Sequence, residues 1–194
     1  MVLLGIAILL AVLGASLTER GRSLLGDHRK LIFLTVVCAV FSFLLIVSIL
    51  QYKSMAVDPF SKFFLPPYQS IRYFMFAVAW ARVFAPYVIS FLLSLIFLAV
   101  ALGYNKEFDE KFFEKEEAYV GALSIFLSGH PQWIFYFIFL VFGYVLVQLY
   151  VRFVMRKVEE RVPLYYLWVP VAIFVILISK YWLSSFEFWS LLKV

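Results

Sequence analysis

The chain alternates between long apolar runs and short clusters of charge, and this alternation limits most strongly how it can fold. A bilayer core about 30 Å thick needs roughly 20 apolar residues per helical crossing, and a helix pairs its own backbone polar groups inside that core. Six such runs occur, at 2–17, 31–50, 83–103, 118–128, 133–151 and 164–183. We therefore expect an all-α, polytopic integral membrane helix bundle of about six transmembrane helices, forming a single domain over residues 1–194.

The composition supports this class and excludes others. Hydrophobic residues make up 65% of the chain and charged residues 15%, and a soluble fold of this size could not cover so much apolar surface. The formal charge of +5 is modest and scattered, so we expect membrane lipids and other membrane subunits as partners, and no nucleic acid.

Cys38 is the only cysteine. A single cysteine excludes an internal disulfide, and the place of Cys38 in an apolar run predicts core packing. The scarcity of Asn and Thr beside abundant Lys, Arg and Glu favours a thermophilic prokaryote.

Basic residues in two loops predict the orientation. Residues 18–30 carry four Lys or Arg residues and residues 152–161 carry four more, so the positive-inside rule places both loops in the cytoplasm. A helical hairpin turning at 129–131 brings them to one side, because Gly commonly ends a helix and Pro is tolerated at the start of the next. Both termini would then lie on the outer side of the cytoplasmic membrane. Whether 118–151 is a full hairpin or a re-entrant segment stays open.

The region before the third run contains turn signals and an unusually long apolar stretch. Asp58-Pro59 and Pro66-Pro67 favour turns over helix, so residues 51–72 are expected to form an ordered cap on the outer face. One helix over 71–103 would be about 48 Å long, well beyond the hydrocarbon core. The sequence therefore predicts a break near Pro86, with residues 73–81 lying along the interface.

Arg82 stands where the third run begins, two residues after Trp80. We interpret Arg82 as snorkelling to the outer headgroups with Trp80 as a stacking partner, which makes both residues candidates for lipid or partner contact. The alternative is an anion or headgroup site. No Asp or Glu lies at the centre of a run, and this disfavours a proton relay.

His28 and His130 are the only histidines, and the expected topology separates them by about 30 Å. They cannot share a haem or metal ion, so we expect no metal site and no cofactor. Ser128-Gly129-His130-Pro131 resembles the Gly-His-Pro piece of haem–copper oxidase subunit I and part of the Ser-Gly-His motif of lipid phosphatases, but the other residues of both families are absent. We interpret the tetrapeptide as a turn, with His130 as a further candidate for lipid or partner contact.

The layout of the acidic residues resembles prepilin peptidases, particularly the archaeal preflagellin type. In that family one catalytic Asp follows the first helix and another precedes a later helical hairpin. Glu19 occupies the first place here, and Glu116 or Glu117 the second, while Arg161-Val162-Pro163 resembles the approach to the family's last helix. Both aspartates and the Gly-x-Gly turn are missing. The resemblance therefore implies a degenerate relative without a working aspartyl dyad.

The first run carries small residues at every fourth position, Ala7, Ala11 and Ala15. Such a stripe lets a second helix approach closely. It resembles the first helix of the substrate-binding components of energy-coupling-factor vitamin transporters, which dock on a partner through it. We expect a non-catalytic subunit of a larger membrane complex, with a small-solute transport component and a degenerate peptidase relative as the alternatives.

Overall fold

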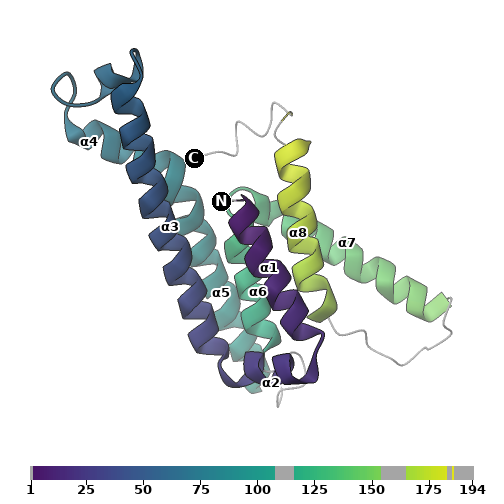
Figure 1. Cartoon of the computed structure of the whole chain (residues 1–194). Coiled ribbons are helices and arrows are strands. Elements are labelled where there is room, and N and C mark those ends of the chain that lie inside the picture. The colour runs from purple at the N-terminus through teal and green to yellow at the C-terminus, as the bar shows by residue number, and fades with distance from the viewer. Residues whose placement is uncertain (1, 108–115, 154–164, 183–184, 186–194) are drawn as a thin grey trace.

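The computed structural model describes residues 2–107, 116–153, 165–182 and 185. The described residues form helices and loops without any strand, so the fold is all-α (Figure 1). The elements in chain order are α1 (Val2–Ser16), α2 (Glu19–Asp27), α3 (Arg29–Val57), the 3₁₀ turn η1 (Ser61–Phe64), α4 (Ile71–Tyr73), the π-helix η2 (Phe74–Phe84), α5 (Ala85–Glu107), α6 (Glu117–Ser128), α7 (Gln132–Phe153) and α8 (Tyr165–Tyr181).

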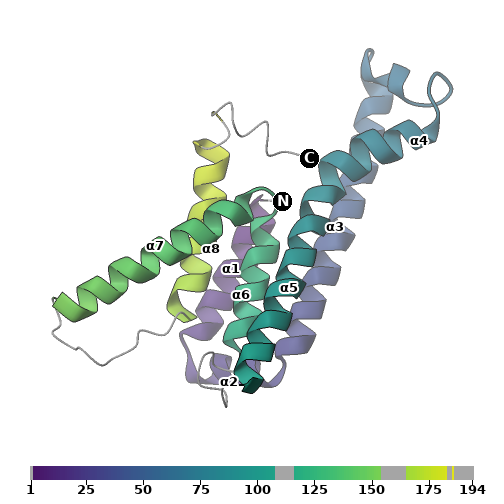
Figure 2. The same cartoon turned by 180° about the vertical axis from the view of Figure 1, so that it is seen from behind.

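Five helices run side by side and a sixth leaves the bundle. Helices α1, α3, α5, α6 and α8 lie roughly parallel, while α7 extends obliquely outward in both views (Figures 1 and 2). One end of the molecule carries α2, and we call it the α2 end. The opposite end carries η1 and α4, and we call it the α4 end.

Several of these helices could cross a membrane. Among the described residues, α3, the continuous run Ile71–Glu107 and α7 are long and apolar enough, and α1 with α2 makes a fourth if that bent pair counts as one span. Helices α6 and α8 are apolar but shorter. At 1.5 Å per residue α6 is about 18 Å long, less than a hydrocarbon core of about 30 Å.

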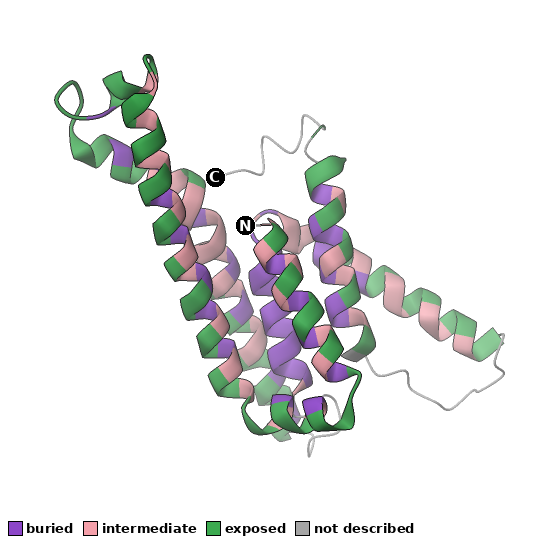
Figure 3. Cartoon of the chain, in the orientation of Figure 1, coloured by how far each residue is buried: buried purple, intermediate pink, exposed green. Residues whose placement is uncertain are grey.

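Helix α6 forms the centre of the core. All twelve of its residues are buried, and Figure 3 shows the buried residues gathered along it while the outer faces of α1 and α3 are exposed. Its side chains are small at many positions, among them Ala118, Gly121, Ala122 and Ser124. Gly121 is needed for this packing, since a Cβ there would lie 2.9 Å from the Phe97 ring and 3.2 Å from the Trp168 ring.

Helix α3 buries only one narrow stripe, formed by Phe33, Val37, Val40, Leu44 and Ser48. These residues recur every three or four positions and so share one helical face. The expectation that Cys38 packs in the core is wrong, because Cys38 falls outside the stripe and is exposed. Membership of an apolar run did not decide burial here; the position around the helix did.

The segment before α5 is helical throughout and has no break at Pro86. Residues 71–107 form one helical run, in which η2 has π-type hydrogen bonding and Ala85 N–H donates to Trp80 O. The run changes direction toward the α4 end (Figure 2). The Pro86 carbonyl accepts from Ser90 Oγ at 3.0 Å and from His130 N–H at 3.2 Å, which ties the start of α5 to the turn after α6.

Candidate functional site

The first helix ends in a sharp corner built by three residues. Helix α2 leaves α1 at 114°. Thr18 is the N-cap of α2, with extended backbone, and its Oγ1 accepts from Gly21 N–H at 3.1 Å. A Cβ on Gly21 would lie only 2.1 Å from the Ala15 carbonyl oxygen. Only glycine fits there, so the sequence fixes where α1 stops and how it turns.

The alanine stripe of α1 and Gly14 lie on its outer side. Ala7 and Ala11 are exposed, Ala15 is half-buried, and Gly14 between them has no atom within 4 Å of an ideal Cβ. Ala7, Ala11 and Gly14 fall within one narrow sector of the helix, which we call the α1 face. The bundle leaves this face uncovered.

The opposite side of α1 provides its internal contacts. Its buried residues are Gly5, Leu9, Val12 and Ser16, and they pack toward α6 and α8. Gly5 comes close to the α6 backbone, with an ideal Cβ 3.6 Å from Leu127 O. Packing within the bundle therefore uses Gly5 and not the stripe of alanines.

Two arginines of the basic loop contact aromatic rings at the α2 end. Arg22 donates to Ser16 O at 2.9 Å and also to the Tyr166 hydroxyl, and its guanidinium lies 5.5 Å from the centre of that ring. Arg29 lies 5.8 Å from the centre of the Tyr119 ring. The Arg22 contacts join α2 to the end of α1 and to α8, and the Arg29 contact joins the start of α3 to α6.

Glu117 is the buried carboxylate of the α2 end. It stands in the first turn of α6, is 3% exposed, and accepts from Trp168 Nε1 at 3.1 Å. The Trp168 carbonyl in turn accepts from the hydroxyl of the fully buried Tyr136 at 3.3 Å. The carboxylate lies at the positive end of α6, and the side chain and backbone carbonyl of Trp168 together link α6, α8 and α7.

The three acidic candidates occupy different environments. Glu19 is exposed in the first turn of α2. Glu116 is the N-cap residue of α6, and its Oε2 lies 3.6 Å from an ideal Cβ on Gly26, near the other end of α2 from Glu19. Those two positions on α2 are about 10 Å apart along the helix. Glu116 thus lies beside the far end of α2, and the Glu117 carboxylate is bound to Trp168.

His130 belongs to the turn that links α6 to α7. Its Nδ1 accepts from Trp133 Nε1 at 3.0 Å and its backbone N–H donates to Pro86. Gly129 before it has φ 75° and ψ 168°, a combination that only glycine adopts readily. All the contacts described for His130 hold the turn in shape.

Arg82 and Trp80 lie on η2, away from the α1 face. Both are exposed. Trp80 lines a groove between η2 and α3, whereas Arg82 is not among the residues that line it. The structure therefore does not gather the six candidate contact residues into one site: three lie on α1, two on η2 and one in the turn after α6.

Sequence reasoning missed Gly21, Trp168 and Ser48. The pattern Thr18-x-x-Gly21 is typical of a helix N-cap followed by a glycine that lets two backbone segments come close. Trp168 is 51 positions from Glu117, and no local pattern relates the two. Ser48 carries a buried hydroxyl in a largely apolar run, and its surroundings follow only from the fold.

Among the described residues, no group of three or more His, Cys, Asp or Glu side chains could hold a metal ion. No known protein family, curated protein or solved structure matches the chain.

Proposed function

We propose that this protein is a non-catalytic, multi-pass subunit of a larger membrane complex, and that another membrane helix docks on the α1 face. The observation that carries the proposal is the outward placement of Ala7, Ala11 and Gly14. In a membrane, helices associate through close backbone approach at small residues. Because internal packing uses the other side of α1, the small outer residues remain accessible to a partner.

The rigidity of α1 adds support. The Thr18–Gly21 cap and the Arg22–Tyr166 contact fix the helix at its α2 end. A fixed helix loses little conformational freedom when a partner docks, and this favours specific association.

The proposal includes six crossings of a prokaryotic cytoplasmic membrane, with both termini outside. Helices α1, α3, α5 and α6 alternate in direction along the bundle, and α8, which follows α7, runs the same way as α6 (Figure 1). Arg22 and Arg29 both lie at the α2 end, which we assign to the cytoplasm. The second basic loop, 152–161, lies outside the described residues except for Arg152 and Phe153.

Two other functions can be separated from this proposal. A small-solute transport component would also dock through α1, but it would in addition bind a small molecule in a saturable manner. A degenerate peptidase relative would share that family's helix layout without its working dyad, and the Glu117–Trp168 hydrogen bond supports a structural role for that acid.

The docking proposal is tested by enlarging one small residue. Ala11→Leu should separate the α1 face from its partner, at a cost of about 1–3 kcal/mol for overpacking. Ala39→Leu, the same change at an exposed position of α3, is the matched control. Complexes extracted from native membranes in mild detergent would be compared by native gel. Equal assembly of the Ala11→Leu variant and the wild type would rule out docking on this face.

The orientation is tested with single cysteines in a Cys38→Ala background. A cysteine at Ser23 should be protected from an impermeant thiol reagent in intact cells, and one at Ser61 should react. Position 157 should be protected like Ser23. Labelling at 157 without labelling at Ser23 would contradict a common cytoplasmic side for the two basic loops.

A further inference from the structure

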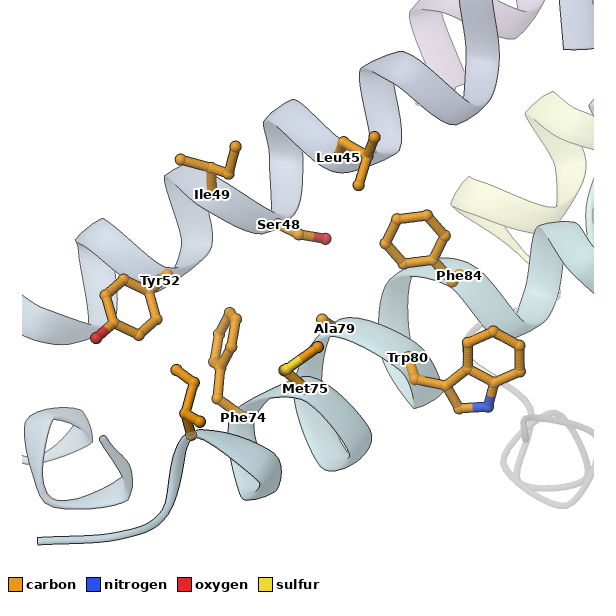
Figure 4. A pocket seen from close by; sticks show the side chains of 10 residues that line it. Leu45, Ser48, Ile49, Tyr52, Phe74, Met75, Ala79, Trp80 and Phe84 are labelled. Carbon is orange, nitrogen blue, oxygen red and sulfur yellow. The ribbon is translucent and has the colours of Figure 1, made fainter. Parts of the chain in front are cut away.

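An apolar groove with a volume of about 620 Å³ lies between α3 and η2 at the α4 end (Figure 4). The α3 wall includes Leu45, Ile49 and Tyr52, and the η2 wall includes Met75 and Phe84. Ligand sites in proteins commonly have volumes of about 300–1,000 Å³, with mostly apolar walls and few polar groups. The groove has this character and lies far from the α1 face.

The π-helical form of η2 creates the groove wall. Hydrogen bonds from i to i+5 give more than four residues per turn, so Met75, Ala79 or Trp80, and Phe84 fall on one side. In an α-helix, 3.6 residues per turn would align Met75 with Ala79 and Arg82 instead. The observed lining contains Phe84 and lacks Arg82. The π-helix thus keeps a cation off the wall and puts an aromatic ring there.

One polar side chain points into this apolar space. Ser48 is 8% exposed, and its Oγ has no hydrogen-bond partner among the described residues. Figure 4 shows the hydroxyl directed from α3 toward η2. Buried polar groups are almost always paired, so this hydroxyl indicates a ligand that brings a hydrogen-bond acceptor.

Charge at the α4 end indicates the kind of ligand. Ser48 lies near the end of the apolar run 31–50, and beyond it residues 51–73 carry three cations, Lys53, Lys62 and Arg72, against one carboxylate, Asp58. All three cations are exposed. The Asp58 Oδ2 already accepts from Ser61 N–H at 2.7 Å. These cations do not line the groove, but each lies next to a lining residue in the chain or in the loop that joins α3 to η2.

We propose that the groove holds one chain of an anionic membrane phospholipid. The Ser48 hydroxyl donates to an ester carbonyl oxygen of the lipid, and the phosphate faces Lys53, Lys62 and Arg72. A docked helix fits less well, because its backbone carbonyls are already paired within the helix and offer no free acceptor to Ser48.

Native mass spectrometry of the purified full-length chain tests this proposal, with dioleoyl phosphatidylglycerol as the probe and dioleoyl phosphatidylcholine for comparison. The wild type should retain one phosphatidylglycerol molecule in preference to phosphatidylcholine. Ala79→Leu fills the groove and should weaken retention about tenfold or more, an effect of the size expected for lost apolar burial. Ala99→Leu, an exposed position of α5, should retain the lipid like the wild type.

Three further variants guard against misfolding of Ala79→Leu. Leu45→Trp narrows the groove, and Leu34→Trp makes the same change at a similarly exposed site of α3 outside it; only the first should lose lipid. Ser48→Ala removes a hydroxyl that has no partner in the part of the chain that the structure describes, so the lipid-free melting temperature should not fall. Retention should drop about 2- to 10-fold, as expected for one hydrogen bond.

Three results would overturn the proposal. Equal phosphatidylglycerol retention by the wild type, Ala79→Leu and Leu45→Trp would show that the lipid binds elsewhere. Equal retention of the two lipids by the wild type would remove the anionic headgroup from the site. A second protein chain that Ala79→Leu displaces, with no change in bound lipid, would assign the groove to a partner helix.

Discussion

Helices α6 and α7 are joined by a turn of three residues and both are strongly apolar, yet they differ sharply in burial. All twelve residues of α6 are buried, whereas α7 buries only Tyr136 and Leu140 of its 22 residues. Small residues on α6 let α5 and α8 approach, while α7 carries aromatic side chains around much of its surface. Hydropathy alone therefore does not decide which of these two helices is buried. The difference follows from the size of the side chains around each helix.

The difference in burial between α6 and α7 is tested most sharply by removing one phenylalanine from each helix. Phe126 of α6 is fully buried and contacts the rings of Phe41, Tyr87 and Phe91. Phe126→Ala should lower the free energy of unfolding by about 3–5 kcal/mol. Phe142 of α7 is 59% exposed, and Phe142→Ala should change it by less than about 0.5 kcal/mol. Thermal unfolding in detergent measures both, and equal losses would contradict a buried α6 and a peripheral α7.

A glycine pair tests the role of small residues. Gly121→Val would force a side chain into the Phe97 and Trp168 rings and should cost about 1–3 kcal/mol. Gly143 of α7 has nothing within 4 Å of an ideal Cβ, so Gly143→Val should stabilise the helix by a few tenths of a kcal/mol, roughly the difference in helix propensity. If Gly121→Val unfolds at the wild-type temperature, close packing against α6 is not required.

The turn between the two helices gives an effect of similar size or smaller. Gly129→Val places a β-branched residue at φ 75°, with an expected strain of about 1–3 kcal/mol. The strain should change the direction in which α7 leaves, and a spin-label distance between a bundle position and α7 would report that change. An unchanged distance together with unchanged stability would mean that the turn does not set the path of α7.

The smallest effect is expected at Glu117, where the two helices meet through Trp168. Glu117→Gln keeps an oxygen acceptor for Trp168 Nε1 and should cost about 1 kcal/mol or less, the difference between a charged and a neutral hydrogen bond. Tryptophan fluorescence and melting temperature would follow the change. A fall of many degrees in melting temperature would show that the charge itself holds α6 in place.

Local patterns were enough for the fold class and for the turns. The apolar runs predicted helices because a helix satisfies its own backbone, and the described chain is helical throughout its main elements. Asp58-Pro59 predicted a turn, and Asp58 is extended there, but α3 continues to Val57, seven residues past the expected end of the span at 50, so the cap begins later than predicted. Gly129 and Pro131 predicted a break, which lies between Ser128 and Gln132. Each of these signals acts within a few residues.

The candidate sites followed a different rule. Sequence spacing placed Ala7, Ala11 and Ala15 on one side of α1, but only the fold decided that this side faces outward. The expected break at Pro86 is absent because the preceding residues adopt a π-helix and keep the run continuous. A hydrogen-bond register of this kind depends on what packs beside it.

The sequence by itself determined that this chain is a set of apolar helices and where several of them stop, since hydropathy, proline and glycine act locally on the backbone. Only the tertiary structure decided which helix lies at the centre, that Glu117 binds an indole 51 positions away, and that Ser48 is buried without a partner among the described residues. Burial and pairing are properties of neighbours brought together from distant parts of the chain. The sequence of a single helix does not predict its burial or its partners when almost every residue in it is apolar.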